Sequence, residues 1–191
     1  QAGIEVSKDD IRLSELLKQI KEKENQGFSF DSASASFEIF ARKNLNQMPN
    51  FFEVKRYRVT TERRIDALGN MNTLSEAVVV VKIGENETLS VSESMDERLN
   101  DLGPVNALAK AIGKDLGKYQ DIIKDLKLVD FKVRITSGGT SAVTRVLIDS
   151  EDSKGTRWST VGVSANILDA SFQALLDSIN WKLINAGATP N

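Results

Sequence analysis

The stretch RWSTVGVSANILDASFQALLDSINWKL, residues 157–183, decides the fold, because a strand pattern turns into a helix pattern within it. Trp158, Thr160 and Gly162 alternate with serine and valine, as in a strand with two different faces. From Ile167 onward, apolar side chains recur at three- and four-residue steps, so one helix face must be buried. Asn166 is a suitable N-cap for this helix. The stretch therefore predicts a helix layered on a sheet.

The same order of elements occurs twice in the chain. Strand patterns at 128–135, 142–149 and 157–164 precede the helix of the second half, with turns at 137–140 and 150–155. Strand patterns at 51–61, 75–83 and 88–92 precede a helix that Gly103 and Pro104 open, since proline suits a first helical position. We predict an α+β fold of two strand-strand-strand-helix repeats, residues 51–118 and 127–185, related by a pseudo-twofold axis.

Two helices are predicted before the repeats, at residues 7–27 and 32–45, and a short one between the repeats at 119–126. A two-helix hairpin of this size buries too little surface to fold well alone. We predict that residues 1–46 form a small helical linker subdomain that packs on other parts of the protein. Residues 47–191 are predicted to form the domain that contains both repeats.

Composition excludes several classes of function. The 191 residues include 25 basic and 27 acidic ones, mixed along the chain, which argues against a nucleic-acid or anionic membrane surface. No apolar run is long enough to span a bilayer, and the absence of cysteine suits the cytoplasm. The sequence has no histidine, so it lacks the commonest general base and transition-metal ligand. We predict no catalytic residue, no metal and no cofactor in this chain, and its start at Gln1 suggests a fragment or processed product.

Several segments resemble the C-terminal regulatory domain of the α-isopropylmalate and citramalate synthases. The resemblance is carried by GPVNAL at 103–108, FKVRI at 131–135, RVLIDS at 145–150, WSTVGVS at 158–164 and ASFQALLDSI at 170–179. Residues 27–40, GFSFDSASASFEIF, resemble the linker subdomain of the citramalate synthase branch. The chain departs from the Gly-x-Gly-Pro-Val loop of the family at its first glycine, where this sequence has Asp101 before Leu102 and Gly103.

The resemblance implies a regulatory function rather than catalysis. The full enzyme would condense acetyl-CoA with pyruvate or 2-oxoisovalerate in a metal-dependent barrel whose ligands include histidines, and that barrel is absent here. The remaining part would form a homodimer, join the catalytic barrel and bind a feedback inhibitor. The inhibitor is isoleucine for a citramalate synthase and leucine for an isopropylmalate synthase. A structural dimerisation module without any effector is the alternative from a different class.

The resemblance places the effector site near the junction of the two repeats. Its apolar candidates are Leu116, Tyr119, Ile123 and Val133. Asp96 could accept from the ammonium group of the amino acid, and free amides near Gly103 and Asn166 could hold its carboxylate. The isoleucine side chain is expected against Tyr119 and Val133. Both alternatives remain open at this point: the apolar candidates could be ordinary core, and Asp96 could be a solvated surface residue.

Overall fold

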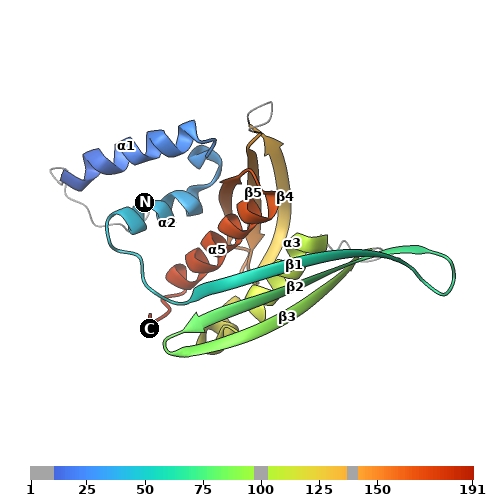
Figure 1. Ribbon diagram of the computed structural model, residues 1–191. Coiled ribbons are helices and arrows are strands. Elements are labelled where there is room, and N and C mark those ends of the chain that lie inside the picture. The colour runs from blue at the N-terminus through green and yellow to red at the C-terminus, as the bar shows by residue number, and fades with distance from the viewer. Residues whose placement is uncertain (1–10, 97–102, 137–141) are drawn as a thin grey trace. The chain divides into compact units, whose positions relative to one another are not determined.

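The computed structural model describes residues 11–96, 103–136 and 142–191 (Figure 1). The predicted turn at 137–140 and residues 97–102 before Gly103 lie outside the described residues. The chain divides into two compact units. Unit 1 consists of residues 1–49 with 125–187, and unit 2 of residues 50–124 with 188–191. The N-terminal helices thus belong to the same unit as the second repeat.

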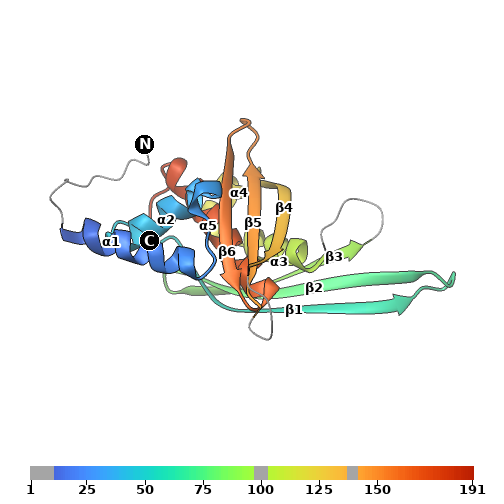
Figure 2. The ribbon, with the colours of Figure 1, turned by 90° about the horizontal axis from the view of Figure 1, so that it is seen from above.

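Unit 2 contains the first repeat. Its antiparallel sheet has the order β1 (Glu53–Ile65), β2 (Met71–Ile83), β3 (Asn86–Asp96). Helix α3 (Gly103–Lys114), the 3-10 turn η2 (Gly117–Tyr119) and the short helix α4 (Gln120–Ile123) follow. Helix α3 packs on the sheet, whose buried β2 positions alternate from Ser75 to Val81. The β1–β2 hairpin extends well past the end of α3 in both views (Figures 1 and 2).

Unit 1 contains the second repeat. Its antiparallel sheet has the order β4 (Lys127–Ile135), β5 (Thr144–Glu151), β6 (Arg157–Ser164), and α5 (Ile167–Asn185) packs on β5 and β6. The Asn166 side chain accepts a hydrogen bond from the Leu168 amide at 2.8 Å, which caps α5 as predicted. At Gly162 the strand lies so close to α5 that an added Cβ would be 1.8 Å from the Ala170 carbonyl oxygen.

The N-terminal helices of unit 1 pack on this second repeat. They are α1 (Ile11–Asn25), the 3-10 turn η1 (Phe30–Ser32) and α2 (Ser34–Asn44), and α2 contacts both α5 and β6. Phe30 and Ala33 form a core cluster with Val161 of β6, and the Phe30 and Phe40 rings lie 5.4 Å apart. Phe40 also packs against the second cluster, which joins α1 to α2.

The predicted fold class is confirmed: an α+β chain with two strand-strand-strand-helix repeats and a small helical N-terminal part. Element boundaries differ from the prediction at the first sheet. There β1 continues to Ile65 and β3 spans Asn86–Asp96, so both strands are longer than expected. The added end of β1, Glu62–Ile65, is exposed and mostly charged, so no hydrophobic alternation marked it in the sequence. None of the described helices is long and apolar enough to cross a membrane.

Candidate functional site

Tyr119, the central candidate for an effector contact, is a core residue of unit 2. Its side chain is 1% exposed, and its ring meets Phe51 edge-on with 5.5 Å between the ring centroids. The Tyr119 hydroxyl donates to the Thr189 carbonyl oxygen at 3.0 Å. A buried tyrosine needs such a partner, and here the protein itself supplies it.

Leu116 and Ile123 lie in the same core as Tyr119. Leu116 is fully buried, and its carbonyl oxygen accepts from the Tyr119 amide at 2.9 Å. Ile123 is also buried, and its Cδ1 lies 3.6 Å from the place where a Cβ on Gly113 of α3 would sit. The structure thus brings three of the predicted residues together, beneath the C-terminal end of α3.

Asp96 and Gly103 are the described residues of unit 2 that directly precede and follow residues 97–102 in the sequence. Gly103 is the first residue of α3 and has a φ of +59°, a left-handed conformation that favours glycine. Asp96 is the last residue of β3 and is in register with Thr73 of β2.

Val133 and Asn166 belong to unit 1. Val133 lies on the outer strand β4, in register with the buried Val146, and is 41% exposed. Because α5 packs on β5 and β6, the apolar side chain of Val133 is left half uncovered. Among the predicted apolar residues, Val133 is thus the one that another molecule can contact directly.

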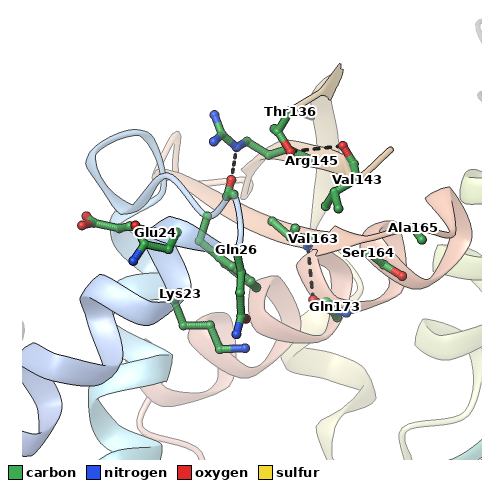
Figure 3. A pocket seen from close by; sticks show the side chains of 13 residues that line it. Lys23, Glu24, Gln26, Thr136, Val143, Arg145, Val163, Ser164, Ala165 and Gln173 are labelled. Atoms are coloured by element: carbon green, nitrogen blue, oxygen red, sulfur yellow. Dashed lines mark hydrogen bonds between the residues drawn. The ribbon is translucent and has the colours of Figure 1, made fainter. Parts of the chain in front are cut away.

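A polar hollow of about 630 Å³ in unit 1 was not predicted (Figure 3). It lies between the end of α1, the start of β5 and the end of β6, beside the first turns of α5. Arg145 Nε donates to the Gly27 carbonyl oxygen at its rim, and the Val163 amide donates to Gln173 Oε1 at 3.2 Å. Gly27 could be recognised in the sequence as a helix stop, but only the fold shows that it meets β5.

Polar contacts fix α2 on the second repeat. Ser36 Oγ accepts from the Val161 amide at 2.9 Å and donates to Asp177 Oδ2 at 2.8 Å. Since β6 is an outer strand of its sheet, Ser36 satisfies a backbone group that the sheet leaves unpaired. Burial raises the pKa of the Asp177 carboxyl, while Lys43, at 3.3 Å, and Ser36 act in the opposite direction.

We expect Ser36→Ala to lower the free energy of unfolding by about 1–3 kcal/mol, because a buried amide and a partly buried carboxylate each lose a partner. Ser34→Ala is the matched control, since Ser34 is exposed on the same helix. That control is expected to change stability by less than about 0.5 kcal/mol. Urea unfolding followed by circular dichroism measures both variants. Equal effects of the two substitutions would contradict the role given to Ser36.

A second polar cluster joins α5 to the β5–β6 turn. Lys182 Nζ lies 2.7 Å from Asp152 Oδ2 and 3.2 Å from Asp125 Oδ1. The hydrogen bond from Lys182 is the largest influence lowering the pKa of Asp152, to about 2. Both carboxylates thus share the single Lys182 ammonium group inside unit 1, which keeps this buried charge paired. No group of three metal-binding side chains occurs among residues 11–96, 103–136 and 142–191.

Comparison with known proteins identifies the family. The model of the LeuA allosteric (dimerisation) domain matches residues 31–183. The (R)-citramalate synthase of Geobacter sulfurreducens is 45% identical over 179 residues, covering 93% of this chain and 32% of that enzyme. The (R)-citramalate synthase of Aquifex aeolicus is 39% identical over 187 residues, covering 95% of this chain and 33% of that enzyme. The 2-isopropylmalate synthase of Pseudoalteromonas atlantica is 29% identical over 116 residues, covering 61% of this chain and 20% of that enzyme. The chain spans about a third of the length of the citramalate synthases it matches, and it belongs to the LeuA allosteric (dimerisation) domain family.

Proposed function

We propose that this chain is the linker and regulatory region of a citramalate synthase, which forms a homodimer and binds isoleucine as a feedback inhibitor. The choice between the citramalate and isopropylmalate synthase branches rests on how much of this chain aligns with the relatives of each branch. The citramalate synthases of Geobacter and Aquifex align with at least 93% of the chain, including the N-terminal helices. The isopropylmalate synthases of Pseudoalteromonas and Archaeoglobus fulgidus align with 61% and 43% of it. A catalytic barrel elsewhere in the same cytoplasmic enzyme would supply the acetyl-CoA chemistry.

The groups available to an amino-acid effector are those that the core does not already use. Val133 offers a half-exposed apolar surface in unit 1. The first turn of α3, opened by Gly103, offers backbone amides in unit 2 that can hold a carboxylate. Leu116, Tyr119 and Ile123 are buried in the core of unit 2, so in this proposal they do not touch the ligand.

The burial of these three residues also favours a second candidate, a structural dimerisation domain without an effector. A core that is fully packed and hydrogen-bonded needs no ligand to complete it.

Leucine is the effector that the resemblance to isopropylmalate synthases implies. It differs from isoleucine by the position of one methyl group. Discrimination on that scale is worth about 1–3 kcal/mol in an apolar pocket.

Thermal unfolding with amino acids separates these functions. A ligand that binds only the folded chain stabilises it by about 2.7 kcal/mol at a hundredfold excess over its dissociation constant. We expect L-isoleucine to raise the melting temperature by several degrees, L-leucine to raise it less, and D-isoleucine to leave it unchanged. D-isoleucine is the matched control, since it has the same composition and hydrophobicity. No shift with any of them at millimolar concentration would favour the structural candidate, and a larger shift with leucine would favour the isopropylmalate synthase branch.

A further inference from the structure

The face of the second sheet that points away from α5 carries an unbalanced charge in one place. Gly162 lies on the face that α5 covers, so the alternate positions form the opposite face, which can be followed row by row across the register. The first three rows hold as many basic as acidic side chains: Lys127, Lys132 and Arg157 against Asp130, Asp149 and Glu151. The last row holds Arg134 and Arg145, in register with each other and with Val163. We call these two residues the arginine pair.

Ion pairs join most charges of the balanced rows. Lys132 Nζ lies 2.5 Å from Asp130 Oδ2 and 3.8 Å from Asp149 Oδ2. Arg157 Nη2 lies 2.8 Å from Glu151 Oε2. The charges of these rows are thus compensated within the sheet itself.

The arginine pair has no such compensation. In the part of the chain that the structure describes, neither Arg134 nor Arg145 takes part in an ion pair. Like charges directly opposite each other on paired strands destabilise a sheet. An arrangement that costs stability without an evident gain in the fold is typical of a functional site. The two guanidinium groups are therefore candidates for binding an anion from outside the chain.

The arginine pair borders the polar hollow of about 630 Å³ (Figure 3). Arg145 lines this hollow, and so does Thr136, which follows Arg134 by two residues on the same face. The volume is within the range of small-molecule sites. Lys23 and Glu24 are the other charged lining residues, and their opposite charges cancel. The net charge of the hollow and its border is therefore the double positive charge of the arginine pair.

Hydrogen-bond donors at the hollow remain available to a ligand. Arg145 uses Nε on the Gly27 carbonyl oxygen, which leaves both Nη groups without a partner among the described residues. Gln173 accepts from the Val163 amide through Oε1, which leaves its Nε2 group as a donor. Asp169, one turn earlier on α5, is engaged in another interaction and does not line the hollow. A guanidinium group presents paired N–H donors that fit two oxygens of a carboxylate or a phosphate.

We propose that the hollow binds a compact dianion whose carboxylate or phosphate groups are held by Arg134 and Arg145. A dianion matches the double positive charge of the arginine pair. An extended polyanion, such as a nucleic acid or an anionic membrane, would also face the acidic residues of the balanced rows and be repelled there. Isoleucine and leucine are zwitterions without net charge, so this site is separate from the proposed effector function and does not depend on it.

Calorimetric titration of this chain at constant ionic strength tests the proposal. The probes are succinate, a dicarboxylate, and methyl phosphate, a phosphate monoester, with acetate as the monoanionic control. We expect saturable binding of one dianion per chain and much weaker binding of acetate. The dianion that binds more tightly identifies whether carboxylate or phosphate groups occupy the site.

Arg134→Gln removes one charge of the arginine pair at an exposed position, so the fold should be kept. We expect this variant to bind the dianion roughly tenfold more weakly or worse, because charge-assisted hydrogen bonds are lost. Arg157→Gln is the matched control, since it removes the same charge from a balanced row of the same face. The control should change the affinity by less than about twofold, because solvent and salt screen a distant exposed charge.

Two results would overturn the proposal. One is an equal loss of affinity in both variants, which would indicate attraction by net charge rather than a site. The other is heat that does not saturate with either dianion in the millimolar range. If Arg134→Gln fails to fold by circular dichroism, nuclear magnetic resonance of the parent chain decides. Succinate or methyl phosphate should then shift the amide signals of Gly27, Val163 and Gln173, and unchanged signals at all three would contradict the site.

Discussion

Gly162→Ala is expected to destabilise unit 1 by about 3 kcal/mol or more, although it adds only one methyl group. The added Cβ would lie 1.8 Å from the Ala170 carbonyl oxygen and 3.0 Å from Gln173 Cβ. The first contact is to helix backbone, which cannot rotate away as a side chain can. Strand β6 and helix α5 would have to separate, which would disturb the central layer of the unit.

Gly113→Ala is the matched control for this experiment. Gly113 lies inside α3, and the described atom nearest to its added Cβ is Ile123 Cδ1 at the ordinary contact distance of 3.6 Å. Alanine in a helix interior is favoured over glycine by about 0.5–1 kcal/mol, so this variant should be slightly more stable. Urea titrations compare the two substitutions directly. Equal stability of Gly162→Ala and the parent would show that β6 and α5 are not packed as described.

Tyr119→Ala is expected to lower the free energy of unfolding by about 3–5 kcal/mol in the absence of any ligand. The side chain is buried, packs against Phe51 and donates to the carbonyl of Thr189. Tyr119→Phe removes only the hydroxyl and should cost about 0.5–1.5 kcal/mol. Denaturant unfolding of both variants separates the packing of the ring from its hydrogen bond.

This result bears on the role of Tyr119 in effector binding. A residue that faces a ligand supports little of the ligand-free core, so its removal would abolish binding and hardly change the melting temperature. The burial of Tyr119 predicts the opposite, namely a large loss of stability without ligand. A ligand-free Tyr119→Ala chain as stable as the parent would contradict the core role and restore Tyr119 as a direct effector contact.

Much of the fold could be predicted, because the spacing of side chains along the sequence matches the faces that are buried in the structure. The alternation at Trp158, Thr160 and Gly162 matches the face that packs on α5, and Asn166 caps the helix that it was predicted to cap. The limit of β1 could not be predicted, because its last residues, Glu62–Ile65, are exposed and carry no buried face that would impose a pattern. Backbone pairing with β2, which continues to Ile65 and Met71, sets the end of β1 instead. The periodicity of apolar residues does not reveal such pairing.

The candidate site was harder to predict than the fold. Leu116, Tyr119 and Ile123 show the same apolar spacing whether they line a pocket or fill a core, and only burial separates these two roles. The contact of Ser36 with Val161 joins residues 125 positions apart, so no local signal could indicate it. The same is true of the bond from Trp181 Nε1 to Glu38 Oε2, which spans 143 positions.

Isothermal titration calorimetry of this chain with L-isoleucine tests the central claim most directly, with D-isoleucine as the control titration. The proposed regulatory function predicts saturable heat that corresponds to one amino acid per chain, with weaker binding of L-leucine. A chain that sediments as a dimer but gives only the heat of dilution with isoleucine and leucine at millimolar concentration would contradict it.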